Sequence, residues 1–492
     1  MCKSALFLAA VLLAVPMTAQ AQTVVAADSR QVLTVDHYAD DGQPGSLRWA
    51  IETSNGQPGH YRIEITPVGQ GALTLRIDRP LPPIKGPVKI EGTAWKADGR
   101  FTAIDGSGYI KRDLKDCPGA NPAEYGTNVR TTTKPGLVLI DTREVELTGL
   151  EVRNFCIGVL VLRTSNSSIH DNRIVRNIGG AGVMFSGDDG QGGSTATTTI
   201  NNKVLRNVFY ENGDGLELTR GAAFNLVADN VFDAGEDNLE PSQGIEILRG
   251  NDNTVVRNLF QNYTDGLQIN WGSRNYLGAN IFRANGFGVS LTGEGNIVDG
   301  NTITGNAVGV AVRPEAGATA NRISRNSIFA NAAPISRCSA GGSCDPKLAK
   351  GGVVLGLPGL EHASFVGKRG YGVSTDTSKM ARICPEAQPC QGLPNGGQAA
   401  PVIARIKVGK AEGHVQTSPG QAVTVELFAN QTAGTNQGQT FVADQVVSAD
   451  AEGLARFSIQ LPQTVFGKIL TATATSAGGA TSSFSAPSPL GR

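Results

Sequence analysis

Hydrophobic residues recur in one short pattern between residues 154 and 331. In each occurrence a glycine precedes apolar residues that alternate with variable ones, the period of two expected for a strand with one buried face. Spacings of 24, 33, 29, 22, 22 and 21 residues separate the seven glycines, which are Gly158, Gly182, Gly215, Gly244, Gly266, Gly288 and Gly309. One short strand per repeat of about 20–30 residues predicts a solenoid, whose units bury their apolar faces only by stacking.

Pairs of asparagines five residues apart lie between these strands. They are Asn172 and Asn177, Asn207 and Asn212, Asn280 and Asn285, Asn301 and Asn306, and Asn326 and Asn331. Asparagine tolerates left-handed backbone and bonds to neighbouring peptide groups, so stacked asparagines suit the corners of a coil. The two patterns together predict an all-β chain whose main part is a right-handed parallel β-helix (a solenoid), followed by a small β-sandwich.

The pattern of apolar and polar residues changes on both sides of these repeats. Lys3, an apolar stretch and a small-residue site at 19–21 are typical of a signal peptide. Ser46 and the residues after it predict a short helix that caps the open end of the solenoid. The expected organisation is 1–21 signal peptide, 22–135 N-terminal cap and first coils with a loop, 136–332 main β-helix, 333–398 irregular disulfide-tied closing segment, and 399–492 β-sandwich of the immunoglobulin-like kind.

Composition excludes several classes of partner. Lys plus Arg equals Asp plus Glu at 43 each, so no global charge indicates nucleic acid or an anionic membrane. No segment after the signal peptide is apolar enough for membrane insertion. We expect an exported protein, periplasmic or secreted, and the sequence leaves an oligomer open.

Six cysteines remain once the signal peptide is removed. An even number in an exported chain favours disulfides over free thiols, and no Cys or His spacing suggests a metal site. Proximity in the sequence suggests the pairs Cys117–Cys156, Cys338–Cys344 and Cys384–Cys390.

Two stretches resemble a known family. Residues 40–51, Asp-Asp-Gly-Gln-Pro-Gly-Ser-Leu-Arg-Trp-Ala-Ile, are similar to the entry segment of exported bacterial β-helix repeat proteins of the pectate-lyase-like superfamily. Residues 425–430, 438–441 and 470–475 resemble the immunoglobulin-like module that follows the helix in such proteins. The resemblance implies the architecture but no single activity, because the superfamily contains enzymes and adhesins.

Carboxylates concentrate on one part of the predicted outer ladder. Positions −1, +2 and +4 from each glycine face outward, and neighbouring rungs are about 4.8 Å apart. On three consecutive coils these positions bring together the candidate catalytic residues Asp214, Glu217, Glu246 and Asp265, and the ladder has no other acids. Carboxylates this close repel one another and raise each other's pKa, which a purely structural face would avoid. We therefore predict a functional site here.

Further residues would line a binding cleft around the acids. Insertions at 187–199 and 233–242 flank the acidic coils, and loops beside a rigid scaffold commonly form such walls. An aromatic ring beside acids and amides is typical of a sugar-binding cleft. The candidate substrate-binding residues are Asp188, Asp189, Arg220, Gln243, Arg249, Gln268, Asn270 and Trp271.

Three functions compete for this face. The leading hypothesis is a glycoside hydrolase that cleaves a polysaccharide, with Glu217 and Glu246 one rung apart as in a retaining pair, or Asp214 and Asp265 two rungs apart as in an inverting pair. The resemblance also implies a polysaccharide lyase, in which the four carboxylates hold Ca²⁺ and Arg220 or Arg249 is the base. The third is a non-catalytic adhesin or glycan-binding solenoid. No cofactor is expected for hydrolysis, and Ca²⁺ belongs to the lyase alternative.

Local motifs leave the choice of polysaccharide open. Residues 263–267 and 187–190 resemble the Asn-Thr-Asp and Gly-Asp-Asp elements of polygalacturonase-like glycosidases, but in reversed order. The Gly-His-Gly and Arg-Ile-Lys elements of those enzymes and the Trp-Ile-Asp-His element of pectate lyases are missing. The excess of acids over bases favours hydrolysis of a neutral glycan.

Overall fold

The computed structural model describes most of the chain between residues 29 and 489. The described ranges are 29–57, 60–69, 73–111, 117, 134–187, 197–235, 238, 242–306, 308–312, 320–331, 353–355, 394–407, 409–431, 437–465 and 467–489. The predicted signal peptide, Asp188, Asp189 and the four cysteines between 333 and 398 lie outside these residues.

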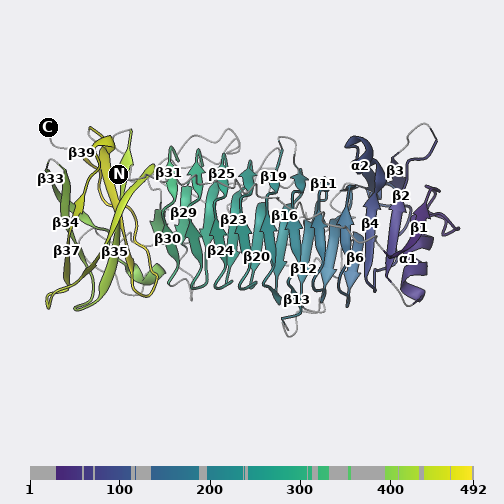
Figure 1. Ribbon diagram of the computed structural model, residues 1–492, viewed down its shortest axis with the longest axis horizontal. Helices are drawn as coiled ribbons and strands as arrows, with labels where there is room; N and C mark the ends of the chain where they lie inside the picture. The colour runs from purple at the N-terminus through teal and green to yellow at the C-terminus, as the bar shows by residue number, and fades with distance from the viewer. Residues whose placement is uncertain are drawn as a thin grey trace, which may run out of the picture.

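Three long parallel sheets wind around one elongated core and form a right-handed parallel β-helix (Figure 1). In the described residues, the first sheet has eleven strands: β1 (Gln31–Val35), β2 (Tyr61–Ile65), β4 (Val88–Gly92), β7 (Glu146–Thr148), β10 (Ser168–His170), β14 (Lys203–Leu205), β18 (Leu226–Ala228), β21 (Thr254–Val256), β24 (Tyr276–Gly278), β27 (Ile297–Asp299) and β30 (Arg322–Ser324). The second has ten: β3 (Thr74–Arg76), β5 (Thr102–Asp105), β8 (Leu150–Arg153), β11 (Arg173–Val175), β15 (Val208–Tyr210), β19 (Val231–Asp233), β22 (Leu259–Gln261), β25 (Ile281–Arg283), β28 (Thr302–Thr304) and β31 (Ser327–Phe329).

The third sheet contains the glycine-led strands that the sequence predicts. Its nine described strands are β6 (Pro135–Ile140), β9 (Ile157–Leu162), β12 (Ala181–Ser186), β16 (Asp214–Thr219), β20 (Gln243–Leu248), β23 (Asp265–Asn270), β26 (Phe287–Leu291), β29 (Val308–Val312) and β32 (Val353–Leu355). A Cβ on Gly244 would lie 2.4 Å from the carbonyl oxygen of Gly266, and a Cβ on Gly215 would lie 2.5 Å from the carbonyl oxygen of Gly244. Glycine is therefore required because the backbones of successive coils meet there. A short pair, β13 (Thr199–Ile200) with β17 (Ala222–Ala223), lies beside this sheet.

The corners of the helix are held by stacked asparagines, as predicted. Each side-chain oxygen accepts from the backbone N–H and the side-chain amide of the asparagine one coil earlier, as Asn280 does from Asn258 at 2.9 and 3.0 Å. The three ladders are Asn202, Asn225, Asn253, Asn275, Asn296 and Asn321; Asn172, Asn207, Asn230, Asn258, Asn280, Asn301 and Asn326; and Asn177, Asn212, Asn285, Asn306 and Asn331. These bonds satisfy buried backbone groups where the chain turns and no strand partner exists.

Aromatic rings fill part of the interior in register. Phe209, Phe232, Phe260 and Phe282 stack with ring centroids 4.4 to 4.9 Å apart and planes within 10° of parallel. Their spacing matches the rise between coils, so each ring packs on its counterpart in the next repeat.

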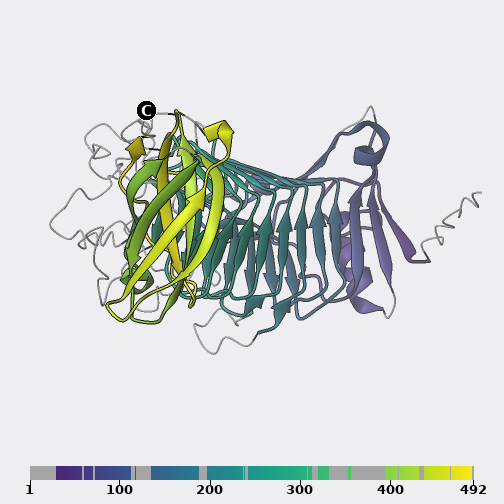
Figure 2. The same ribbon diagram turned by 60° about the vertical axis from the view of Figure 1, so that its left-hand side comes forward.

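The N-terminal end is closed by the predicted amphipathic helix α1 (Leu47–Gly56), at the purple end in Figures 1 and 2. The Ser46 hydroxyl accepts from the Trp49 N–H, and Leu47, Ala50 and Ile51 are buried against the first coils. Arg48 is buried as well and pairs with Asp40 at 2.8 Å. A second, shorter helix, α2 (Thr93–Asp98), was not predicted.

The C-terminal module consists of two antiparallel sheets packed together, the immunoglobulin-like arrangement (Figure 2). One contains β33 (Val402–Lys407), β34 (Lys410–Gln416) and β37 (Leu454–Gln460), and the other contains β36 (Thr440–Ser448), β35 (Ala422–Asn430), β38 (Ile469–Ser476) and β39 (Ser488–Pro489). The sequence pattern missed β34, where a glycine and charged residues interrupt the alternation. The module contacts the last coils directly: Ile328 pairs with Gly438, and the Glu426 carboxylate accepts from the Ser324 hydroxyl at 2.6 Å.

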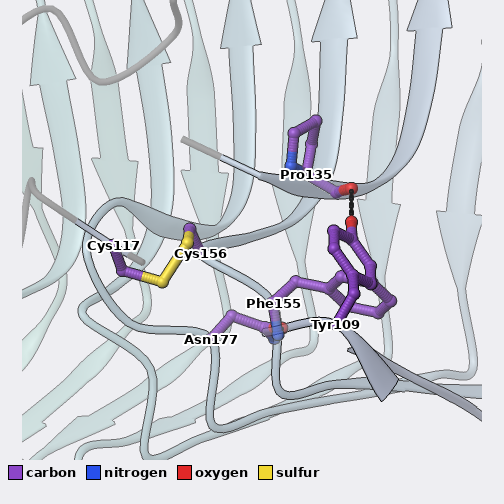
Figure 3. The surroundings of a disulfide bond; sticks show 6 residues. All are labelled: Tyr109, Cys117, Pro135, Phe155, Cys156 and Asn177. Carbon is purple, nitrogen blue, oxygen red and sulfur yellow. Dashed lines mark hydrogen bonds between the residues drawn. A yellow bond between two sulfur atoms is a disulfide. The ribbon is translucent and has the colours of Figure 1, made fainter. Parts of the chain in front are cut away.

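One predicted disulfide is confirmed. Cys117 and Cys156 are bonded, with Cα atoms 5.3 Å apart, and both are buried. Figure 3 shows the bond beside Phe155 and Asn177, at the corner that leads into β9. Nearby, the Tyr109 hydroxyl donates to the carbonyl of Pro135, the first residue of β6. The disulfide therefore attaches the chain near residue 117 to the entrance of the third sheet.

Removing one ladder amide should destabilise the helix strongly. We expect Asn258→Ala to lower the free energy of unfolding by about 2–4 kcal/mol, because it leaves buried groups on two neighbouring coils without partners. Urea denaturation followed by circular dichroism measures this. Lys203→Ala, at an exposed strand position, is the matched control and should change stability by less than about 0.5 kcal/mol. Equal effects of the two substitutions would contradict the structural role given to the ladders.

Glu146 and His170 should make stability depend on pH. Hydrogen bonds from His170 and Lys89 lower the pKa of Glu146 to about 2, and the same Glu146 carboxylate, with Asp171, raises the pKa of His170. The Glu146 contribution is present above its ordinary pKa and is lost as pH falls from about 4.5 to 2. The His170 contribution is complete below about pH 6.5 and is lost as pH rises through the higher folded pKa. Glu146→Gln should therefore cost about 1–2 kcal/mol near pH 5.5 and much less at pH 2, measured by denaturation at each pH.

Candidate functional site

The strand register brings the predicted acids onto adjacent rungs. In β16, β20 and β23, Glu217 lies opposite Glu246, which lies opposite Gln268. Gln243 lies opposite Asp265, and Asp214 lies opposite Ala181 on the other side. The outward positions predicted from the glycine spacing are therefore next to one another, as expected.

Burial distinguishes this part of the sheet from an ordinary solvated face. Glu217 is 8% exposed and Asp265 is 3% exposed, while Asp214 and Glu246 are half-buried. The outward residues of the preceding coils are buried and apolar: Ile157, Leu160, Leu162, Ala181 and Met184. Phe287, Val308 and Ala311 on the following coils are also buried. The acids thus form a polar patch between two apolar ones, and burying a carboxylate without function is costly.

Three of the carboxylates come close enough to share one ion. One oxygen each from Asp214, Glu217 and Glu246 lies within 4.8 Å of the other two. Carboxylate oxygens are the ligands that Ca²⁺ and Mg²⁺ prefer, and two oxygens on one Ca²⁺ are at most about 4.8 Å apart. Asp265, the fourth predicted acid, lies outside this group.

A chain of side-chain amides connects Asp265 with Glu246 and orients both carboxylates. Asn270 donates to Glu246 at 2.7 Å and to the side-chain oxygen of Gln268 at 2.6 Å, and Gln268 donates to Asp265 at 2.6 Å. The Gln243 backbone N–H donates to Asp214 at 3.1 Å. Donated amide hydrogens stabilise the ionised carboxylates and hold Glu246 and Asp265 in fixed positions, as a general base or ligand requires.

Two buried hydroxyls were missed by the sequence interpretation. Thr219 follows Glu217 on the same face of β16 and is fully buried, and Tyr263, just before β23, is 2% exposed. Neither hydroxyl has a hydrogen-bond partner among the described residues. Burial raises the pKa of Tyr263 well above its usual value, and the negative charges of Asp233 and Asp214 raise it further. A signal for Tyr263 exists in the sequence, since it occupies the place of a corner asparagine.

The third asparagine ladder is interrupted at this coil. Between Asn212 and Asn285 the two intervening coils use Asn238, which donates to the Asn212 carbonyl at 2.6 Å, and Tyr263, whose N–H donates to Asn285. The regular corner is thus replaced beside Asp214, Gln243 and Asp265. A departure from the repeat at this one place supports a functional role for these coils.

Arg220, Arg249 and Trp271 form the edge of the site. Each follows the last residue of its strand, and the Arg220 and Arg249 N–H groups donate to the carbonyls of Leu248 and Asn270 on the next coil. The Arg249 guanidinium lies 5.6 Å from the centre of the Trp271 ring, which is 48% exposed. The structure therefore brings together all the predicted site residues that it describes.

The fold and this face define a right-handed parallel β-helix protein of the pectate-lyase-like kind with a C-terminal immunoglobulin-like module. A family model described as periplasmic copper-binding protein (NosD) matches residues 121–310 and 225–341, less than half of the chain. The chain is 50% identical over 431 residues to a curated 3-dehydroshikimate dehydratase of Acinetobacter baylyi, covering 87% of this chain and 88% of that protein. It therefore belongs to the family of that dehydratase.

Solved structures match the chain only at low similarity. An alginate lyase from a Paenibacillus strain is 12% identical, with a TM-score of 0.35, over 61% of this chain and 97% of its own. The Dettilon tailspike protein is 15% identical, with a TM-score of 0.39, over 92% and 93%. A DFA-IIIase from Arthrobacter chlorophenolicus is 16% identical, with a TM-score of 0.33, over 65% and 75%. These values are too low to transfer any activity to this chain.

In the part of the chain that the structure describes, no helix is long and apolar enough to cross a membrane.

The unpartnered hydroxyl of Thr219 yields a stability prediction. Thr219→Val should leave the free energy of unfolding unchanged or raise it by about 1 kcal/mol, because it replaces an unsatisfied buried hydroxyl by a methyl group. Thr292→Val on the same outward row is the matched control, since the Thr292 hydroxyl donates to Ile269 and accepts from Trp271. The control should lose about 1–2 kcal/mol in thermal or urea denaturation. A comparable loss in Thr219→Val would mean that its hydroxyl has a structural partner.

Proposed function

We propose that this protein is a dehydratase that converts 3-dehydroshikimate, or a closely related hydroxylated oxo-cyclohexene carboxylate, at the face formed by β16, β20 and β23. The observation that carries the proposal is the 50% identity with a curated dehydratase across nearly the whole of both chains. The buried carboxylates on these strands are the candidate catalytic groups and support the proposal.

The reaction requires groups of the kind gathered here. A base removes the ring proton next to the ketone, the hydroxyl one carbon further leaves as water, and loss of a further ring proton to the oxygen of the former ketone gives 3,4-dihydroxybenzoate. One water is lost and no oxidant is needed. A positioned carboxylate can act as the base, and a protonated one can supply the proton to the leaving hydroxyl.

Glu246 is the residue that best fits the role of base. It is half-buried, and Asn270 holds one of its oxygens at 2.7 Å, so its other oxygen has a defined direction. Glu217, one rung away and more deeply buried, is the candidate for the general acid. The amides of Gln243 and Gln268 provide donors for ring oxygens.

A divalent cation, Ca²⁺ or a similar hard ion, also fits Asp214, Glu217 and Glu246, and with the ion bound Glu217 and Glu246 would be its ligands instead of the acid and the base. Bound there, it would polarise a substrate oxygen and stabilise negative charge on it. Three carboxylates are not the nitrogen and sulfur ligands that copper prefers, so these residues do not suit the metal named in the partial family match.

Among the hypotheses from the sequence, elimination is now favoured over hydrolysis. Dehydration is an elimination, so the family favours elimination chemistry over glycoside hydrolysis at the same carboxylates. Cleavage of a polysaccharide and simple glycan binding remain predictions, and the assay below includes them. We also infer export, which the predicted signal peptide and the Cys117–Cys156 disulfide support.

The direct test is turnover of 3-dehydroshikimate by the purified full chain. Formation of 3,4-dihydroxybenzoate is followed by its ultraviolet absorbance, and Glu246→Gln should lower kcat about 100-fold or more because the base is lost. Glu452→Gln, at an exposed site in the C-terminal module, should leave kcat unchanged. EDTA treatment, with Ca²⁺ or Mg²⁺ added back, tests the cation.

A parallel screen covers neutral and acidic polysaccharides, recording reducing ends and the absorbance of unsaturated products. Absence of the aromatic product, together with reducing ends that Glu217→Gln or Glu246→Gln abolishes, would replace the dehydratase by a hydrolase. Binding of a glycan without any product would instead favour the adhesin.

A further inference from the structure

The corner arginines of the helix follow a rule that breaks at the site. Along the corners, four arginines with left-handed backbone each pair with an acid on a neighbouring coil, which also has left-handed backbone. The pairs are Arg163 with Asp141 at 2.6 Å, Arg206 with Asp171 at 2.7 Å, Arg257 with Asp229 at 2.7 Å and Arg274 with Asp252 at 2.7 Å. An acid one rung away is thus the ordinary partner of a corner arginine.

Arg249 departs from this rule. Its neighbours on the adjoining coils are Arg220 and Trp271, and no carboxylate among the described residues lies within ion-pair distance of its guanidinium. The guanidinium of Arg249 therefore brings a positive charge to the edge of the site that no described carboxylate neutralises. Arg249 is exposed and lies over the face of Trp271, which orients the guanidinium. The arrangement has the charge and the geometry of an anion site.

The position of this edge relative to the acids determines how a substrate would lie. Arg249 directly follows Leu248, the last residue of β20, and Glu246 lies two residues before that end. The carboxylate of Glu246 and the guanidinium of Arg249 thus belong to the same end of one strand. The acidic patch repels a substrate carboxylate, so the anionic end of a ligand is expected at Arg249 and the rest of its ring toward Glu246.

We propose that Arg249, held over the face of Trp271, binds the carboxylate of a small cyclic acid and so orients its ring over the carboxylate cluster. This inference deepens the proposed function and rests on it for the identity of the ring, while the anion site itself stands on Arg249.

Equilibrium binding of shikimate and of methyl shikimate to the full chain tests the site. Shikimate lacks the ketone and does not react, and the methyl ester lacks the charge. Arg249→Gln should weaken the binding of shikimate about 10- to 100-fold, because a charge-assisted hydrogen bond is lost. The same substitution should change the binding of the methyl ester little. Arg274→Gln removes a corner arginine of the paired kind and should affect neither ligand. Titration calorimetry measures the affinities of both ligands for the wild type and the two variants.

The outcomes separate this inference from the proposed function. With 3-dehydroshikimate, Arg249→Gln should raise KM more than it lowers kcat, whereas Glu246→Gln should lower kcat and keep the affinity for shikimate. Equal shikimate affinity in Arg249→Gln and wild type would overturn the anion site, even if the wild type is an active dehydratase. If Arg249→Gln weakens the binding of shikimate but not of its methyl ester, and 3-dehydroshikimate is not turned over, the anion site is supported and the dehydratase activity is refuted.

Discussion

The hydrogen bonds between successive coils are the interaction on which the rest of this molecule depends. Each strand donates to and accepts from the coil above and below, and the asparagine ladders continue the same bonding around the corners where strands end. Because every coil repeats the one before it, a side chain at one position lies directly over its counterparts. The spacing of about 4.8 Å between rungs is therefore imposed on whatever residues occupy a row.

That imposed spacing explains how a site arises from so few changes. An interior row carries stacked phenylalanines, a corner row carries asparagines, and the outward row of the third sheet carries apolar residues along most of its length. Replacing the outward residues by acids on three coils places Asp214, Glu217 and Glu246 together without any special loop. The scaffold supplies the energy that holds these like charges close, which is why a stable solenoid can carry a destabilising cluster.

The sequence was sufficient for the repeat and much of the site, because both obey the same periodicity. The glycine spacing located seven of the nine described strands of the third sheet, and the positions relative to Gly215, Gly244 and Gly266 identified the acids and amides that the register places side by side. Burial of the outer face could not be predicted, because it depends on how the flanking coils and the segments beside them pack. Thr219 was missed for the same reason, since a hydroxyl without a partner is visible only in three dimensions, whereas Tyr263 is marked in the sequence by its place in the asparagine row. The polysaccharide hypothesis came from the fold alone, and one fold carries many chemistries.

The last coil of the helix has a further property. A stack of identical coils has an end that resembles a template, on which another chain could add strands and extend the stack into a fibre. Here Asn395 and Gln437 occupy the positions that the next asparagines would take, accepting from Asn321 at 2.6 Å and from Asn331 at 3.0 Å. Two of the three ladders thus terminate on side chains of this same molecule. These two side chains therefore cap the end of the helix and occupy the groups that an added strand would need.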